Sequence, residues 1–398
     1  MSNFDNPQIL HVSNSVLEGS KVLQRGSQEY EKENDSYLSA FENEVKPTYI
    51  VKPSNVRQVQ SLVQNLYSHV LSGDCQVAVR GAGGTPVPGS ANIQDGVTID
   101  LRGLKGIKLN EDKSVVEIGY GLTTAGARTG RVGIGGFILG ENADLWIALK
   151  GGLNNFGIVT SLKMKTFKSA DIWGGVIFYM SGNMFDTFLQ LLRNAYDFVH
   201  NEENPPSLQR FATLKDQVKG MGIMRTSTYL GFANELSNFS SDGKRQYWAT
   251  PTIKPDVSLM EAFHRKWKDT LSAIQDAQGL TFSFGFHPLS KAMLENSAKA
   301  DAPLFVVLVN PGWELPEDDT RIFTAVGDLI AELRHLATEN GLLHRYIFPN
   351  YAYQTDDIIA GYGEESVRKL RGTSEKYDPE GFFQKGVPGG FKLQTKKA

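Results

Sequence analysis

The stretch VRGAGGTPVPGSANI, residues 79–93, places four glycines and two prolines directly after a short apolar run. Glycines at such a turn let main-chain N–H groups approach a bulky anion closely, most often a phosphate. Arg80, at the mouth of the loop, would add a fixed positive charge. An ordinary irregular connection explains a single glycine cluster equally well. Two further clusters, at residues 132–140 and 151–157, favour a binding loop.

The composition is that of an ordinary globular protein. The chain has 398 residues, 40% hydrophobic and 21% charged, which is enough for two domains with a substantial core. The formal net charge of −3 gives no indication of a nucleic-acid or anionic-membrane partner. Cys75 is the only cysteine, which excludes an internal disulfide and fits a reducing compartment. Neither a signal peptide nor a bilayer-spanning run is evident, so we expect a cytoplasmic protein with no membrane partner; the sequence indicates no oligomeric state.

The pattern up to residue 170 begins as an α/β unit. Tyr49–Val51, Gln76–Val79 and Val97–Leu101 are predicted strands, and apolar residues between Val56 and Val70 recur at helical spacing after a Ser54 cap. This order places the 79–93 loop beyond the carboxyl end of a strand, where such sheets bind ligands. Further elements are expected as a helix at Ser13–Leu23 and strands at Ser114–Gly119 and Ile158–Phe167.

From residue 172 the pattern changes to strands separated by long amphipathic helices, which is typical of an antiparallel sheet with helices on one face. The strands are expected at Gly175–Met180, Thr281–Phe286 and Leu304–Val309, and the helices at Met184–His200, Leu259–Gln278 and Arg321–Glu339. A strand at Tyr346–Tyr351 and a helix at Glu364–Glu375 then precede a tail rich in glycine and proline.

Several motifs in one order resemble the FAD-linked oxidases of the vanillyl-alcohol-oxidase type, and most closely their fungal berberine-bridge-enzyme-like members. The motifs are IVKPSNVRQVQSLV (50–63), VRGAGGTPVPGSANI (79–93), VTIDL (97–101), VGIGGFILG (132–140), DLWIALKGGLNNFGIVT (144–160) and the closing segment 350–393. The resemblance implies an α+β protein with a PCMH-type FAD-binding domain closed by the C-terminal segment. The expected division is an N-terminal segment 1–45, an internally shortened FAD-binding domain 46–170, a substrate domain 171–345 with an antiparallel sheet and helices, and a berberine-like segment 346–393.

The function that the resemblance implies is oxidation of a small substrate of the secondary-metabolite type, with hydride transfer to FAD and oxygen as acceptor. The first glycine loop would wrap the FAD pyrophosphate, the second would follow the flavin, and the third would contact the adenine half. The residues expected to touch FAD are Arg80, Gly81, Ala82, Gly83, Gly84, Thr85, Gly133, Gly135, Gly136, Asn155, Gly157, Ile158 and Val159. The flavin performs the difficult step, and protein groups orient it and remove a proton.

Tyr346, Asn350 and Tyr351 are the candidate catalytic residues, because the corresponding family strand returns under the flavin ring. A tyrosine can accept a proton if its pKa is lowered, and an asparagine can bind flavin or substrate by hydrogen bonds. Both tyrosines could instead be ordinary core residues. His287 and His344 are further candidates, although a lone histidine is more often structural. No metal site is predicted, since the seven histidines are scattered and no cysteine pair exists.

Two departures from the family qualify these expectations. Gly84 stands where many relatives carry the histidine that binds FAD covalently, and the second anchor position falls near Thr129, so any FAD is expected to be noncovalent. Relatives also carry a tryptophan-bearing helix before the VGIGG motif and several dozen residues between Gly140 and Asp144. Their absence removes paired strands and part of the core. Either exons are missing from the predicted coding sequence, or this is a natural variant with a compromised flavin site. The alternative function is therefore a flavin-poor or inactive relative that acts as a binding or scaffold protein.

Overall fold

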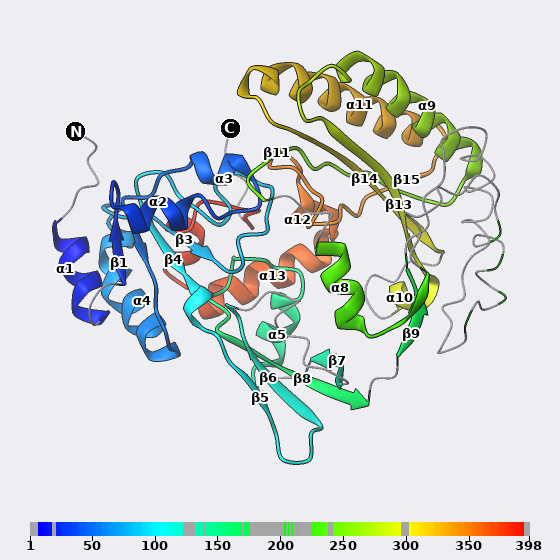
Figure 1. The fold of residues 1–398 in the computed structure, drawn as a ribbon. Helices are drawn as coiled ribbons and strands as arrows, with labels where there is room; N and C mark the ends of the chain where they lie inside the picture. Colours follow the sequence, from blue (N-terminus) through cyan, green and yellow to red (C-terminus); the bar gives the residue numbers. More distant parts are fainter. Residues whose placement is uncertain are drawn as a thin grey trace.

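The computed structural model describes residues 7–17, 21–121, 132–137, 141–168, 171–175, 224–237, 242–295 and 302–393, together with residues 203, 206, 209 and 213. Figure 1 shows two bodies of helices and sheets lying side by side, with the C-terminal helices returning to the first body. The predicted α+β class is confirmed, because helices occur together with largely antiparallel sheets. Within these residues, no helix has both the length and the hydrophobicity needed to cross a bilayer.

The first sheet carries the glycine loop. Its strand order is β1 (Val22–Gln24), β2 (Tyr49–Val51), β4 (Val97–Asp100) and β3 (Val77–Arg80), with β2, β4 and β3 parallel and β1 antiparallel to β2. All three residues of β2 and all four of β4 are buried, as expected for parallel strands covered on both faces. The loop at residues 81–93 therefore leaves the carboxyl end of β3.

Helix α4 (Val56–Leu71) covers this sheet with Val59, Leu62, Leu66 and Val70, which share one face at helical spacing. The capping residue is Asn55, whose side chain accepts a hydrogen bond from the N–H of Gln58, and the predicted Ser54 cap is wrong.

The predicted helix at Ser13–Leu23 is placed too far along the chain. Helix α1 is Pro7–Val16, and Leu23 is instead buried in β1, where pairing with β2 outweighs helical propensity. Short helices α2 (Gln28–Asn34) and α3 (Ala40–Glu44) follow β1.

The second sheet is fully antiparallel and projects from the first body as a long hairpin (Figure 1). Its order is β5 (Ile107–Leu109), β6 (Val115–Gly119), β8 (Ser161–Lys168) and β7 (Val132–Phe137). The second glycine cluster thus forms an edge strand, with Gly133 opposite Phe167 and Gly135 opposite Lys165. Helix α5 (Ala143–Leu149) precedes the third cluster, and a 3₁₀ turn, η1 (Leu101–Gly103), follows β4.

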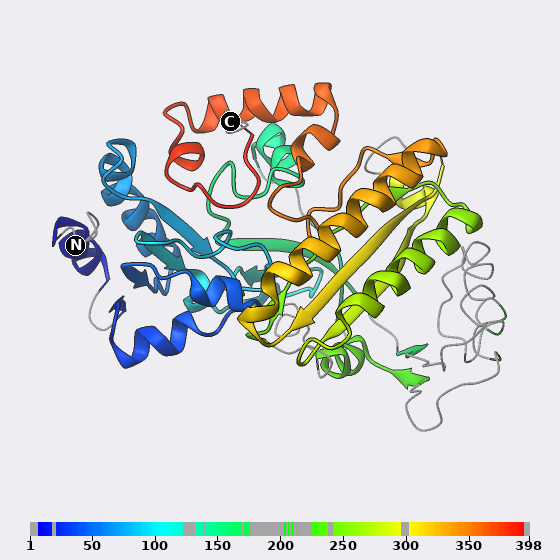
Figure 2. The same cartoon turned by 90° about the horizontal axis from the view of Figure 1, so that it is seen from above.

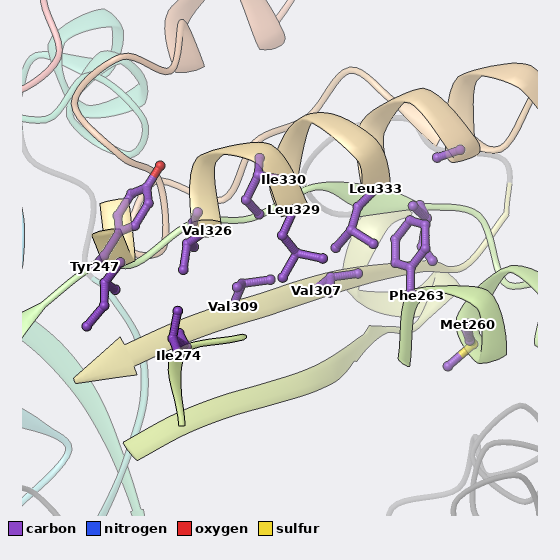
Figure 3. Packing of buried hydrophobic residues seen from close by; sticks show 14 of the residues in the cluster. Tyr247, Met260, Phe263, Ile274, Val307, Val309, Val326, Leu329, Ile330 and Leu333 are labelled. Atoms are coloured by element: carbon purple, nitrogen blue, oxygen red, sulfur yellow. The ribbon is translucent and has the colours of Figure 1, made fainter. Parts of the chain in front are cut away.

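The third sheet is the core of the second body. The long strands β13 (Thr281–Leu289) and β14 (Leu304–Trp313) pair along nine residues, and β11 (Arg245–Gln246), β12 (Thr252–Ile253) and β15 (Leu343–His344) extend the sheet. Helices α9 (Val257–Ile274) and α11 (Asp319–Glu339) cover one face. Figure 3 shows Val307 and Val309 pointing at Leu329 and Leu333 of α11.

The remaining elements of this body are β9 (Ile172–Gly174), β10 (Arg225–Ser227), α8 (Tyr229–Ser237), α10 (Lys291–Glu295) and the 3₁₀ turn η2 (Pro316–Asp318). Beyond Gly175, the predicted strand Gly175–Met180 and helix Met184–His200 lie outside the described residues. The predicted strand at Tyr346–Tyr351 is wrong: pairing ends at His344, and Tyr351 N–H closes a turn on the Phe348 carbonyl at 3.0 Å. Pro349, which lacks an N–H, lies inside that turn.

The C-terminal segment returns to the first sheet through α12 (Ile358–Gly361), α13 (Glu364–Tyr377) and α14 (Phe382–Lys385). The Gly386 carbonyl accepts the Val77 N–H at 2.7 Å, so the tail binds the strand that feeds the glycine loop. Phe382 is 1% exposed and its ring lies parallel to that of Tyr67 on α4, with centroids 5.6 Å apart. Figure 2 shows α13 beside α5, and Lys376 pairs with Asp144 there at 2.6 Å.

Candidate functional site

The first glycine loop presents a row of unused main-chain donors. Among the described residues, none accepts a hydrogen bond from the N–H groups of Gly81 to Thr85. Gly83 has φ +80°, a conformation that favours glycine, and its carbonyl accepts the Leu38 N–H at 3.0 Å. Ala82 and Gly84 are exposed, and a Cβ on Gly84 would meet nothing within 4 Å. Consecutive free N–H groups in a loop can bind phosphate groups, although Gly83 at the middle of this row is itself buried.

The far half of the loop is held by a buried carboxylate that the sequence reasoning missed. Glu42 of α3 is 0% exposed, and its two carboxylate oxygens accept the N–H groups of Gly89 at 3.0 Å and Ala91 at 2.8 Å. Burial raises the pKa of Glu42 to about 7, against the opposing effect of these bonds. Asn92, also buried, donates to the carbonyls of Glu42 and Val45. Residues 34–45 therefore shape the loop from behind.

The Arg80 guanidinium lies beside Gly83 of the loop, where a Cβ would be 2.9 Å from its Nη2, but it is buried and does not face the outside of the loop. The guanidinium is fully buried and donates to the carbonyls of Glu33 at 2.8 Å and Ser36 at 2.5 Å. The group also stacks on the Tyr37 ring at 3.5 Å, and burial lowers the Arg80 pKa. The side chain thus fastens the segment after α2 to the end of β3. The expectation of a cation facing a phosphate is not supported, and Arg80 acts on the loop by positioning it.

The third glycine cluster meets the C-terminal tail at this loop. Asn155 is 0% exposed: its amide donates to the carbonyls of Gly152 and Phe391, both at 2.8 Å, and its side-chain oxygen accepts from Gln384. A Cβ on Gly389 would collide with the carbonyl of Gly89, so the tail lies directly on the first loop. The side-chain amide and oxygen of Asn155 therefore both form hydrogen bonds within the protein. Within the described chain, the N–H groups of Gly157, Ile158 and Val159 have no acceptor.

The first loop, the end of β6 and the start of β8 also lie together. A Cβ on Gly81 would lie 3.3 Å from the Tyr120 ring, and the Tyr120 N–H bonds the Thr160 carbonyl at 3.0 Å. The structure places Gly133, Gly135 and Gly136 on edge strand β7, which pairs with β8 and is irregular at Gly136. The position near Thr129 lies outside the described residues. The C-terminal tail contacts both the first and the third glycine clusters. It thereby brings these two groups of predicted cofactor residues close together.

The three candidate catalytic residues do not form one cluster. Asn350 is exposed on the turn before Tyr351. Tyr346 faces Tyr362, with ring centroids 6.5 Å apart, whereas Tyr351 lies 5.4 Å from the rings of both His287 and Trp248. Burial raises the pKa of Tyr346 and of Tyr351. Neither phenol is thereby prepared as a base, contrary to the lowered pKa that such a role requires.

Comparisons with known proteins show what this chain is similar to. The family described as "FAD binding domain" matches residues 47–140. The FAD-dependent monooxygenase CTB5 of Cercospora nicotianae is 25% identical, over 90% of this chain and 99% of its own length. The FAD-dependent monooxygenase tpcD of Cochliobolus heterostrophus is 25% identical, over 87% of this chain and 84% of its own length. The chain is therefore similar to FAD-dependent oxidoreductases, and residues 47–140 match an FAD-binding domain. FAD is its cofactor, and the protein is an enzyme, an FAD-linked oxidoreductase.

Solved structures show the same fold for this FAD-linked oxidoreductase. The 6-hydroxy-D-nicotine oxidase of Arthrobacter nicotinovorans superposes with a TM-score of 0.73 at 16% identity, covering 94% of this chain and 98% of that one. BBE-like 1 of Physcomitrella patens gives 0.74 at 15% identity, covering 97% and 99%. The CTB5 alignment runs over 454 positions, more than the 398 residues of this oxidoreductase, so the relative has residues where this chain has none.

The residues present fit the phosphate part of FAD. The donor array at Gly81 to Thr85 would hold the pyrophosphate, and the N–H groups of Gly157 to Val159 are available for the rest of the nucleotide. When bound, FAD supplies a two-electron acceptor for a substrate C–H bond. The chain's own groups shape and orient the loop. Glu42 and Arg80 do so from buried positions, and only Arg80 had been singled out from the sequence.

Proposed function

We propose that this oxidoreductase oxidises a small natural product of the secondary-metabolite type, partly aromatic or alicyclic, with oxygen as the final electron acceptor. The observation that carries the proposal is the row of free N–H groups from Gly81 to Thr85, next to a tail from the far end of the chain. The redox chemistry is supported by the names of the fungal relatives, FAD-dependent monooxygenases, and the substrate class follows from the family resemblance of the sequence. The acceptor is supported by fold neighbours named chitooligosaccharide oxidase and xylooligosaccharide oxidase.

The residue roles that we propose follow the sites described above. The main chain of residues 80–85, 133–136 and 155–159 would hold FAD, and Tyr346, Asn350 and Tyr351 would border the substrate. We assign Tyr351 a hydrogen-bonding and stacking role, since its raised pKa disfavours proton abstraction. We also propose the division into segments 1–45, 46–170, 171–345 and 346–393. The bonds of Gly386 to Val77 and of Asn154 to Gly389, the latter at 3.0 Å, support a C-terminal segment packed on the FAD domain.

The test is a redox titration of the purified chain. After loading with FAD and removal of free cofactor, absorbance at about 450 nm reports bound oxidised flavin. An anaerobic panel of aromatic and alicyclic alcohols should bleach it, and admitted oxygen should restore it. Bound flavin that no alcohol bleaches would refute the substrate class, and bleaching that oxygen fails to reverse would refute the acceptor.

The second candidate is a flavin-poor binding protein that keeps the same fold. The observation that favours it is the length of the CTB5 alignment, which means that the chain lacks residues present in an active relative. The same loading experiment decides between the two. A protein that remains colourless at high FAD concentration, yet melts cooperatively, would support the binding protein.

A further inference from the structure

The third sheet has a second face, turned away from α9 and α11. Side chains alternate between the two faces of a strand. Because Phe305, Val307 and Val309 point into the helix-covered core, Val306 and Asn310 point the other way. Strand pairing sets His287 and Thr252 opposite Val306, and His344 opposite Thr252. His287, Val306, Thr252 and His344 therefore form one row across four strands, on the face that we call the open face. His287 is exposed at one end of this row, whereas Val306 and Thr252 at its middle are each only 1% exposed.

The open face carries polar atoms that the protein does not satisfy. Thr252 Oγ1 and Asn310 Nδ2 are buried and have no hydrogen-bond partner among the described residues. Buried polar groups are almost always paired with protein, water or ligand. Two such atoms on one face show that this face is polar beneath its exposed rim, where His287 lies.

The two histidines of the row differ in what they already bind. His344 Nδ1 accepts the N–H of Tyr346 at 3.1 Å, which fixes that ring to the main chain. His287 is exposed, and within the described chain neither of its ring nitrogens has a hydrogen-bond partner. Its Nε2 would lie 3.6 Å from a Cβ on Gly285, so the ring extends over a position without a side chain. Partial desolvation lowers the pKa of His287, and no charged group adds to that shift.

Aromatic rings border His287 on the open face. Tyr351 lies 5.4 Å from His287 and 5.4 Å from Trp248, and Phe348 meets Tyr351 edge-on at 4.9 Å. Tyr351 is also the titratable group that faces His287, and its phenol stays protonated because burial raises its pKa. The ring planes are inclined by 52° to 86°, and inclined or edge-on ring contacts are favourable, so this aromatic corner suits a further flat ring. The imidazole next to it offers a free nitrogen lone pair at neutral pH.

We infer that His287 is the proton acceptor for a flat aromatic alcohol bound on the open face beside Tyr351 and Trp248; this inference rests on the proposed function. The substrate O–H bond breaks and its proton goes to the His287 imidazole. The neighbouring C–H bond breaks and its hydrogen leaves with the electron pair as hydride, for which the oxidised flavin is the acceptor. A C=O bond forms, so the alcohol is oxidised and the flavin reduced.

The binding test uses two probes that differ in one hydroxyl, 1-naphthalenemethanol and 1-methylnaphthalene, titrated against the full chain by tryptophan fluorescence. The wild type should bind the alcohol about three- to tenfold more tightly, the effect of one hydrogen bond. His287→Phe should abolish this preference, because phenylalanine keeps the ring and removes the acceptor. His344→Gln is the matched control in the same row and should keep the preference. Equal binding of both probes by the wild type, or an unchanged preference in H287F, would overturn the inference.

A second variant separates binding from proton transfer. His287→Gln keeps a hydrogen-bond acceptor, so it should retain the preference for the alcohol while flavin reduction slows by at least about a hundredfold. Because the His287 pKa is lowered, the wild-type reduction rate should fall only at a pH below the ordinary imidazole pKa of about 6.5, as the imidazole becomes protonated. In H287Q this decrease at low pH should be absent. Wild-type rate and pH profile in H287Q would refute the role of His287 while leaving the oxidoreductase proposal intact. Absence of any bleaching in the wild type would instead refute the proposed function, and the probe preference would still report on His287.

Discussion

Glu42 shows how a single buried carboxylate can set the shape of a binding loop. Its oxygens accept two main-chain N–H groups from the far half of the glycine loop, at Gly89 and Ala91. Those two donors are thereby withdrawn from ligand binding, while the donors from Gly81 to Thr85 stay free. The carboxyl group is desolvated in this position, and its pKa rises from 4.5 to about 7. The charged carboxylate that holds the loop is therefore destabilised by burial, and the size of this effect depends on pH.

We predict that Glu42→Gln flattens the pH dependence of stability. Because the folded-state pKa lies above the unfolded one, this group contributes stability that is complete below about pH 4.5 and lost as pH rises through about 7. The free energy of unfolding attributable to Glu42 should fall by at most about 3 kcal/mol across that range. Urea unfolding at both ends of the range measures the effect in wild type and E42Q. Glu111→Gln, at an exposed turn, is the control that should behave as wild type, and identical slopes in E42Q would refute the prediction.

Arg80→Lys should destabilise the first body even though the charge is kept. A lysine cannot bond the carbonyls of Glu33 and Ser36 simultaneously or stack on Tyr37 as a planar group. We expect a loss of about 2–4 kcal/mol in the free energy of unfolding. Arg57→Lys, on the exposed surface of α4, is the matched control and should change stability very little. A normal melting temperature for R80K would show that the buried guanidinium is dispensable.

The residue types at this site were predictable from the sequence, but the directions in which their side chains point were not. The glycine positions and the basic residue at the end of β3 follow from local spacing. The partners of Arg80, however, lie 47 and 44 residues earlier in the chain, in a polar stretch with no periodic signal. Glu42 is likewise an ordinary helix residue until the fold buries it. Side-chain direction therefore depends on long-range packing that local spacing does not encode.

At the scale of elements, the long periodic segments were predicted within a few residues. Helices α9, α11 and α13 and strands β13 and β14 occur where apolar spacing placed them, because each must bury one continuous face. The strand at Tyr346–Tyr351 failed since aromatic alternation there reflects contacts with the open face and with Tyr362, not a ladder. A short segment that is held in place by side-chain packing does not need a periodic pattern of apolar residues, so its structure cannot be predicted from one.

The contact between the C-terminal tail and the glycine loop is the element-level feature most open to a test. Gly389→Ala would force a methyl group into the carbonyl of Gly89, so the two segments must separate. We expect a loss of about 1–3 kcal/mol in stability and weaker FAD binding. Gly372→Ala in α13 is the control: a Cβ there meets nothing within 4 Å, and it should stabilise the protein by about 0.5–1 kcal/mol. Unchanged FAD affinity in a folded G389A protein would separate the tail from the cofactor site.

For the whole molecule, the mode of cofactor attachment follows from what the accessible loop lacks. Gly84 has no nucleophilic side chain and open space around it, so this position offers a cofactor no covalent attachment. We predict that acid or heat denaturation releases all the flavin into the supernatant. Fluorescence that stays with the protein band on a denaturing gel would contradict this. Gly84→His should not by itself create a covalent bond, because a bond also requires the flavin ring to be held in register.

The last prediction concerns how firmly the shortened chain holds that ring. The phosphate-binding donors are local to two loops and the tail, all of which the chain retains. The flavin ring needs an apolar wall and donors on both sides, and the longer CTB5 relative has residues that this chain lacks. We therefore expect FAD affinity in the micromolar range or weaker, with ADP binding almost as well as FAD and FMN binding poorly. Calorimetric titration of the three ligands tests this, and G389A should weaken FAD and ADP equally. Tight, stoichiometric FAD with negligible ADP binding would mean that another part of the chain closes the flavin pocket.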